Sequence, residues 1–118
     1  MNQNLKGKAF ERKVVRLIKH KWLDARRTSE VQRRKDSGLP DIDGTPYFIE
    51  CKHLTRRFTR GAIDQIVEKV KHDWSIFKTM ETWVIIYRQT GEHDLWVVVP
   101  SMSCDWSIIP FNKFLEVY

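Results

Sequence analysis

Residues 40–52 read Pro-Asp-Ile-Asp-Gly-Thr-Pro-Tyr-Phe-Ile-Glu-Cys-Lys, and this stretch decides the fold that we expect. Turn-forming residues at 44–46 lie between two short strand-like runs, which predicts a β-hairpin. Side chains of a strand alternate between its two faces, so Glu50 and Lys52 point together while the residue between them points the other way.

The position of Asp41 relative to that face depends on the loop of the hairpin. The first arm is Asp41–Asp43 and the second is Tyr47–Lys52. We expect Ile42 to pair with Tyr47 around a four-residue loop, which puts Asp41 on the face of Glu50, next to it. An odd number of loop residues would turn Asp41 to the opposite face.

Two carboxylates and an ammonium group on one face match the needs of phosphodiester hydrolysis. This reaction requires a hard divalent cation held by carboxylates, a water activated on that cation and a positive group near the developing charge. Asp41, Glu50 and Lys52 supply these groups. The ordinary alternative is a half-buried hairpin with solvated ion pairs, because isolated Glu-x-Lys triplets are common. The preceding Pro-Asp and the apolar alternate positions favour the catalytic interpretation.

Hydrophobic periodicity on both sides of the hairpin predicts the remaining elements. Before it we expect a helix from Leu5 to Trp22 and a short strand or extended segment from Asp24 to Val31. After it we expect a helix from Gly61 to Lys78, strands at Trp83–Arg88 and Leu95–Val99 joined by a turn at Thr90-Gly91, and a short strand or helix within Ile108–Tyr118. This order predicts one α/β domain over residues 1–118, with a central mixed β-sheet flanked by helices.

The size and composition of the chain are those of a globular intracellular protein. Its 118 residues suffice for one core, and 42% are hydrophobic. The longest apolar stretch is too short to cross a bilayer, and the first residues lack the apolar segment of a secretory leader. Cys51 and Cys104 form no framework for disulfides, and no histidine or cysteine spacing predicts a zinc site. We expect no membrane association and no small-molecule cofactor.

The net charge of +6 favours a polyanionic partner. Cationic side chains release condensed counterions from nucleic acid when they neutralise its phosphates. Acidic lipid is the other polyanion to consider, but no basic amphipathic helix with an aromatic insertion face stands out. Nucleic acid is therefore the expected partner.

A further carboxylate, Glu11, lies on the apolar stripe of the first helix. It is three or four residues from Val14 and Val15 and seven from Ile18. A carboxylate on a core-facing stripe must find a cation or become neutral. One explanation is an ion pair with Lys8 from the preceding turn; the other is that Glu11 reaches the same metal ion as the hairpin carboxylates.

Basic residues bracket the acidic hairpin in the sequence. As a group they predict a track for DNA phosphates, whereas each one alone is equally well explained as part of a solvated charged loop. An aromatic-rich platform for single strands is not evident among them, which favours duplex substrates. These residues are Arg26, Arg27, Arg33, Arg34, Lys35, Arg56, Arg57 and Arg60.

Three motifs together resemble the PD-(D/E)xK nuclease superfamily, and within it most closely the archaeal and phage-type Holliday junction resolvases. The motifs are Gly7-Lys-Ala-Phe-Glu11-Arg-Lys-Val-Val-Arg-Leu, Ser37-Gly-Leu-Pro-Asp41-Ile and Phe48-Ile-Glu50-Cys-Lys52. The resemblance covers about the first half of the chain. The Glu-Arg setting of the first motif and the Ser-Gly-x-Pro-Asp run make it more specific than the short PD-(D/E)xK pattern alone.

The resemblance implies a restriction-endonuclease-like fold, dependence on Mg²⁺ or Mn²⁺, and a homodimer that nicks four-way DNA junctions symmetrically. It implies that Asp41 and Glu50 bind the metal, with Glu11 as a third acidic contributor and the Cys51 backbone carbonyl as a further ligand. Lys52 would orient or activate the attacking water and stabilise charge on the phosphate. Ser37 matches a serine near the site, and Gln65 corresponds to a helix glutamine of several branches. The charged loop Thr28–Ser37 has no assigned role.

Two alternatives remain open at this point. One is a related nuclease that acts on nicks, flaps, ends or a specific duplex sequence, because the superfamily shares its fold among these substrates. The other is a DNA-binding module without catalysis. A resolvase must dimerise to cut a two-fold symmetric junction twice. The apolar second hairpin, Trp83–Val99, and Trp106 are candidate interface residues.

Overall fold

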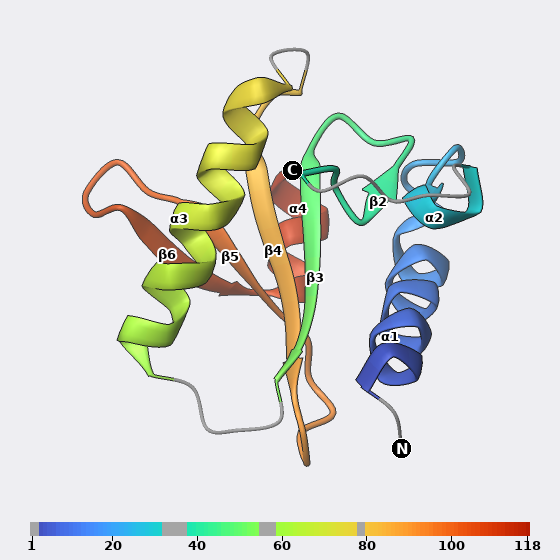
Figure 1. Cartoon of the computed structure of the whole chain (residues 1–118), viewed down its shortest axis with the longest axis horizontal. Helices are drawn as coiled ribbons and strands as arrows, with labels where there is room; N and C mark the ends of the chain where they lie inside the picture. Colours follow the sequence, from blue (N-terminus) through green and yellow to red (C-terminus); the bar gives the residue numbers. More distant parts are fainter. Residues whose placement is uncertain (1–2, 32–37, 55–58, 78–79) are drawn as a thin grey trace.

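The computed structural model describes residues 3–31, 38–54, 59–77 and 80–118. Six strands form one sheet in the order of the chain, with β3 and β4 parallel and the other neighbours antiparallel (Figure 1). The elements are α1 (Gln3–Ile18), β1 (Arg26–Arg27), α2 (Thr28–Val31), β2 (Ile42–Asp43), β3 (Phe48–Leu54), α3 (Arg60–Ile76), β4 (Trp83–Gln89), β5 (Trp96–Pro100), β6 (Trp106–Pro110) and α4 (Phe111–Val117). The expected mixed sheet flanked by helices is confirmed.

Helix α3 is the crossover that a parallel pair of strands requires. It begins after Thr59, whose side chain accepts a hydrogen bond from the Ala62 amide at 3.2 Å and so caps the helix. Its buried residues pack with Phe48 of β3 and Ile85 of β4 in a core on one face of the sheet. They are Ile63, Val67 and Val70. We call this side of the sheet the α3 face.

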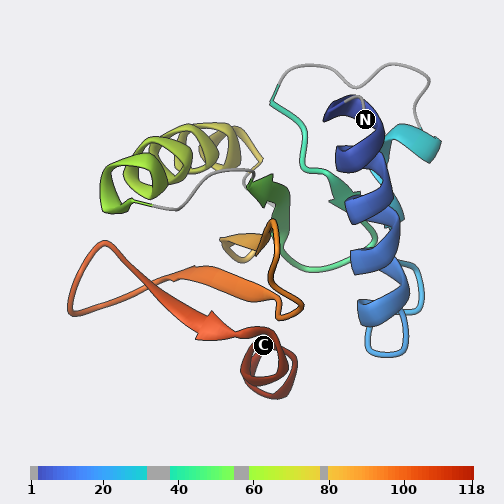
Figure 2. The ribbon, with the colours of Figure 1, turned by 90° about the horizontal axis from the view of Figure 1, so that it is seen from below.

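Helices α1 and α4 cover the other side, which we call the α1 face (Figure 2). Phe10, Val14 and Ile18 of α1 are buried against Ile49 of β3, as their spacing predicts. At one end of this core, Phe114 of α4 is surrounded by aromatic rings. Its ring contacts those of Trp22, Tyr47, Phe111 and Tyr118.

The segment after α1 differs from the expectation. The helix ends at Ile18 instead of Trp22, and the chain then turns so that Trp22 joins the aromatic cluster. The segment Asp24–Val31 is not one strand: β1 has two residues, and α2 follows at once. The Asp41 carbonyl accepts the Thr28 amide, so pairing with the hairpin stops where the helical turn starts.

The C-terminal half agrees with the expectation and extends it. Strands β4 and β5 form the predicted antiparallel hairpin. The tail contains both a strand and a helix instead of one of them, and the strand begins at Trp106, before the expected segment. Among the described residues no helix is long and apolar enough to cross a membrane.

Candidate active site

Strands β2 and β3 pair in a register that places Ile42 opposite Ile49. The expected partner of Ile42, Tyr47, is therefore wrong by two residues. The connection is longer because Gly44, with φ +84°, packs so tightly that a Cβ there would lie 2.0 Å from the Asp24 carbonyl oxygen. Tyr47 instead enters the aromatic cluster of the α1 face. A shift of two residues leaves the side chain of Ile42 on its expected face, in the core with Ile49.

Asp41 is held directly against β3. Its Oδ2 accepts a hydrogen bond from the Cys51 amide at 2.8 Å, and its own amide donates to the Ile49 carbonyl at 2.8 Å. The bond to Ile49 departs by one residue from the register of Ile42 and Ile49, so Asp41 lies beside the segment of β3 from Ile49 to Cys51, which contains Glu50. Asp41 is 3% exposed and Glu50 is 7% exposed, so two carboxylates lie at adjacent positions with little access to water. Two such groups must be stabilised by cations, by hydrogen bonds or by protonation.

Lys52 supplies one cation to this pair. Its Nζ lies 3.8 Å from Glu50 Oε1, on the α3 face of β3. The lysine stem lines a small cavity with Ile63 and Ile66 of α3, and this packing orients the side chain. The Lys52 side chain is 39% exposed, so its ammonium group is accessible from solvent. The expected common face of Glu50 and Lys52 is confirmed.

Two further residues lie beside the candidate site and were not predicted. Thr28, the first residue of α2, donates its amide to the Asp41 carbonyl at 3.0 Å and so lies next to Asp41. Thr28 is 5% exposed, and its Oγ1 has no hydrogen-bond partner among the described residues. The expected extended segment gave no reason to single it out.

Tyr87 is the parallel partner of Lys52 on β4 and lines the same small cavity. Burial, with a smaller contribution from the charge of Glu92, raises the pKa of Tyr87 to about 12. Its phenol is therefore neutral beside the candidate site. Sequence alone could not find this residue, because the parallel register of β3 and β4 is set by the crossover.

Glu11 has a partner that neither sequence explanation named. Its Oε1 lies 3.2 Å from Nε of Arg27, and both side chains are largely buried. Lys8 is exposed instead. Because Arg27 pairs with Ile42, whose side chain belongs to the core under α1, the Glu11–Arg27 pair lies on the α1 face. The structure thus brings Glu50 and Lys52 together on the α3 face, holds Asp41 against Cys51 of the same strand, and ties Glu11 to Arg27 on the α1 face.

The oxygen ligands on the α3 face fit a magnesium ion. Within the described ranges, no three His, Cys, Asp or Glu side chains converge in a way that would hold a metal. Mg²⁺, however, is usually bound by one or two carboxylates and keeps several waters. Asp41 and Glu50 supply the carboxylates, and the orphaned Thr28 hydroxyl is a hydrogen-bonding group on the residue next to Asp41. The metal role of Glu11 and of the Cys51 carbonyl stays a prediction.

The expected DNA-binding residues fall into two groups. Arg33, Arg34, Lys35, Ser37, Arg56 and Arg57 lie outside the described residues. Of the others, Arg26 is exposed, 3.7 Å from Asp43, whereas Arg27 is 5% exposed and is engaged by Glu11. Arg60 lies over the Trp106 ring, 4.8 Å from its centroid. A surface track is therefore compatible with Arg26 and Arg60, and burial argues against Arg27.

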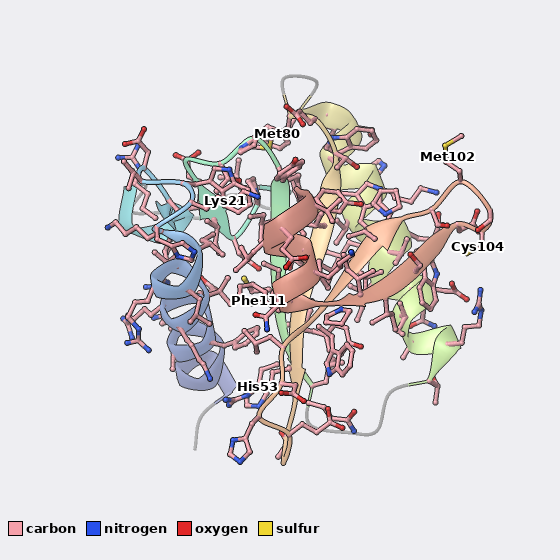
Figure 3. The ribbon with its side chains drawn as sticks, turned by 180° about the vertical axis from the view of Figure 1, so that it is seen from behind. Lys21, His53, Met80, Met102, Cys104 and Phe111 are labelled. Carbon is pink, nitrogen blue, oxygen red and sulfur yellow. The ribbon has the colours of Figure 1, made fainter. Side chains whose placement is uncertain are left out.

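Gln65 and Trp106, singled out from the sequence, and His53 next to the Glu-x-Lys triplet have clear positions. Gln65 is exposed on α3. His53 points to the α1 face, where its ring lies 6.1 Å from Phe10 (Figure 3). Trp106 is 6% exposed, and its Nε1 donates to Asp64 at 2.6 Å, so within the chain it is a core residue, and its role as a dimer contact stays a prediction. The strands β4 and β5 are likewise interior to the sheet.

Comparison of the chain with protein-family models, with curated proteins and with solved structures finds no match.

Proposed function

We propose that this protein is a Mg²⁺- or Mn²⁺-dependent endonuclease that hydrolyses phosphodiester bonds of DNA at Asp41, Glu50 and Lys52. The supporting observation is a pair of buried carboxylates, Asp41 immediately before β2 and Glu50 on β3, with an ammonium group 3.8 Å from Glu50. Carboxylate oxygens are the ligands that Mg²⁺ and Mn²⁺ prefer, and a divalent cation offsets the negative charge of both groups. The proposed substrate implies a location with the DNA, in the cytoplasm or nucleoid.

Each residue has a distinct role in this proposal. Asp41 and Glu50 hold the metal, and the hydrogen bond from the Cys51 amide fixes the orientation of the Asp41 carboxylate. A bound Mg²⁺ would supply positive charge at the scissile phosphate and a more acidic water. Lys52, accessible from solvent, orients the attacking water and stabilises the negative charge that develops on the phosphate.

The finer part of the proposal is that the chain is a PD-(D/E)xK nuclease with a restriction-endonuclease-like fold, acting as a homodimeric Holliday junction resolvase. The sequence motifs around Glu11, Asp41 and Glu50 support the family. A mixed sheet with α3 as the crossover after the Glu-x-Lys strand agrees with them. One site per chain requires a second copy for two symmetric cuts.

The test is a cleavage assay on a labelled four-way junction, a linear duplex with the same arm sequence and a single strand. Each is incubated with Mg²⁺, Mn²⁺, Ca²⁺ or EDTA. We expect nicks at the junction with Mg²⁺ or Mn²⁺ only, and no nicks by Asp41→Asn or Lys52→Ala. Asp43→Asn is the matched control, because Asp43 lies two residues along the same strand and its side chain is 43% exposed.

The outcomes distinguish a junction resolvase from a related nuclease and from a DNA-binding module, and they test the assigned site. Cleavage of linear duplex, nicks or flaps in preference to the junction would replace the resolvase by a related nuclease. A chain that binds DNA without cutting any substrate would make it a binding module. Cleavage by Asp41→Asn at the wild-type rate would refute the assigned site. Light scattering of the chain alone and on the junction tests the dimer.

A further inference from the structure

The positive charge of the described protein is concentrated on one helix. The α1 segment contains five lysines or arginines and one carboxylate, Glu11, which turns inward to Arg27. Helix α3 contains three cations and three carboxylates. Its Lys69 pairs with Asp73 at 3.4 Å and its Lys71 with Glu68 at 3.9 Å. The two long helices cover opposite faces of the sheet, so these faces differ strongly in charge (Figure 2).

Four cations form a continuous stripe on the outer side of α1 and the turn that directly follows it, where the Lys19 amide still bonds to the Val15 carbonyl. Lys8, Arg12, Arg16 and Lys19 are all exposed, and in the part of the chain that the structure describes none forms an ion pair. Their steps of four, four and three residues keep them within an arc of about 80°. The side of the helix with Val14 is buried, so this arc faces solvent. We call these four residues the α1 basic stripe.

The stripe is unfavourable for the helix itself. Like charges four residues apart destabilise a helix, and both Lys8–Arg12 and Arg12–Arg16 have this spacing. Arg16 lies in the last turn of α1, where the helix dipole favours a positive charge and offsets part of this repulsion. The chain thus has at α1 an arrangement that an external polyanion would relieve.

We infer that the α1 basic stripe binds the phosphates of duplex DNA at a surface separate from the candidate active site, which lies on the α3 face, so that the stripe holds a different DNA segment from the one that is cut. The choice of DNA rests on the proposed function. The stripe is about 16 Å long at 1.5 Å per residue, which exceeds the roughly 12 Å width of the major groove. It can therefore reach phosphates on both sides of that groove. None of its residues belongs to the candidate active site or to the basic loops that the sequence singled out.

Salt dependence of binding gives the measurement. Each phosphate neutralised contributes about 0.9 to the slope of log K against log salt for duplex DNA. Loss of two contacts at Arg12 and Arg16 lowers the slope by about 2, which corresponds to roughly a hundredfold weaker binding at 0.1 M salt. Fluorescence anisotropy of a labelled duplex in EDTA measures this without cleavage.

The matched control is the double variant Lys69→Gln/Lys71→Gln on α3, which removes the same charge from paired residues. We expect Arg12→Gln/Arg16→Gln to bind duplex DNA more weakly and with a smaller slope of log K against log salt. The α3 variant should keep nearly the wild-type slope. The stripe variant should also melt at or above the wild-type temperature, because it loses a like-charge repulsion. Equal losses in both variants would show an effect of net charge alone and would overturn the inference, as would wild-type binding by the stripe variant.

A second arm uses vesicles of equal parts phosphatidylserine and phosphatidylcholine. A stripe variant that loses vesicle binding but keeps duplex binding would assign the stripe to a membrane surface and overturn the inference. The experiments distinguish failure of this inference from failure of the proposed function. If the wild-type chain binds DNA through the stripe in EDTA but does not cut DNA with Mg²⁺, the nuclease proposal is refuted and the stripe is supported. If the chain cuts DNA but the stripe variant binds as wild type does, the nuclease proposal is supported and the stripe is refuted.

Discussion

Replacing Asp41 by asparagine removes one negative charge from a buried pair and keeps its shape. The Asp41 side chain is 3% exposed, and its Oδ2 accepts the Cys51 amide at 2.8 Å. The asparagine side-chain oxygen can accept the same hydrogen bond, so the junction of β2 and β3 should persist. The substitution therefore isolates the electrostatic contribution of Asp41 from its packing.

The expected change in stability follows from two opposing terms. Opposite and diagonal neighbours on paired strands have Cβ atoms about 5–8 Å apart. Two unit charges at this separation repel by roughly 2–3 kcal/mol at an effective dielectric constant of 20. Lys52, 3.8 Å from Glu50, offsets part of this repulsion. Exchanging a charged hydrogen-bond acceptor for a neutral one costs about 1 kcal/mol. The variant should be more stable than wild type in EDTA by about 1–2 kcal/mol.

Urea unfolding followed by tryptophan fluorescence, in EDTA and in Mg²⁺, measures the stability of the metal-free protein and its stabilisation by the metal. In EDTA the midpoint of the variant should rise. Added Mg²⁺ should stabilise the wild type, because a ligand of the native state does so by mass action, and should have little effect on the variant. Asp43→Asn should differ from wild type by less than about 0.5 kcal/mol, since it removes only an exposed ion pair with Arg26.

One result would refute this reasoning directly. If Asp41→Asn is destabilised in EDTA by more than about 1 kcal/mol, the carboxylate is a structural hydrogen-bond acceptor and not half of a repelling pair. A stabilisation by Mg²⁺ that is equal in the variant and in wild type would place the metal elsewhere.

Further predictions concern catalysis and the surroundings of the site. Lys52→Ala should lower the cleavage rate by about 10²–10³-fold with DNA affinity in Ca²⁺ nearly intact, and a marked loss of affinity would contradict its catalytic role. Asp41→Asn should bind DNA in Ca²⁺ at least as tightly as wild type, because it removes a negative charge; weaker binding counts against this. Because the folded pKa of Tyr87 is raised from 10 to about 12, its contribution to stability is constant below pH 10 and falls by up to about 3 kcal/mol between pH 10 and 12. Urea unfolding of Tyr87→Phe should not show this loss of stability between pH 10 and 12. If the variant loses as much stability over this pH range as wild type, Tyr87 is not its cause. Glu11→Gln should lower the free energy of unfolding by about 3 kcal/mol, because Arg27 keeps its charge in a buried setting. The double variant Glu11→Gln/Arg27→Gln should regain part of this stability. If the effects of the two single substitutions simply add in the double variant, the pairing of Glu11 with Arg27 is contradicted.

The predicted stability of Asp41→Asn and of the stripe variant has a common physical cause. In both places like charges are held together, once in the interior and once on α1, and each arrangement destabilises the isolated chain. In both places a bound partner of opposite charge would remove the repulsion, a divalent cation at Asp41 and DNA phosphates at Arg12 and Arg16. Residues that lower the stability of the free protein in this way are candidates for binding.

The face on which Glu50 and Lys52 lie could be predicted from the sequence, whereas the partners of the site residues could not. Alternation along a strand is local, so Glu50 and Lys52 share a face wherever the strand is placed. The parity of the loop predicts Asp41 on the same face, but the Asp41 amide bonds to the Ile49 carbonyl one residue out of register, so this expectation stays a prediction. The loop length depends on how Gly44 packs against the Asp24 backbone, a contact between segments twenty residues apart.

What the sequence by itself determined is everything that follows from a repeat of two or of 3.6 residues: the strand with Glu50 and Lys52, the buried sides of α1 and α3, and the cationic excess of α1. Only the tertiary structure decided which segments meet. It paired Glu11 with Arg27, put Thr28 next to Asp41 and brought Tyr87 beside Lys52. These contacts join residues far apart in the chain, and their choice depends on how the whole core packs, which no local pattern encodes.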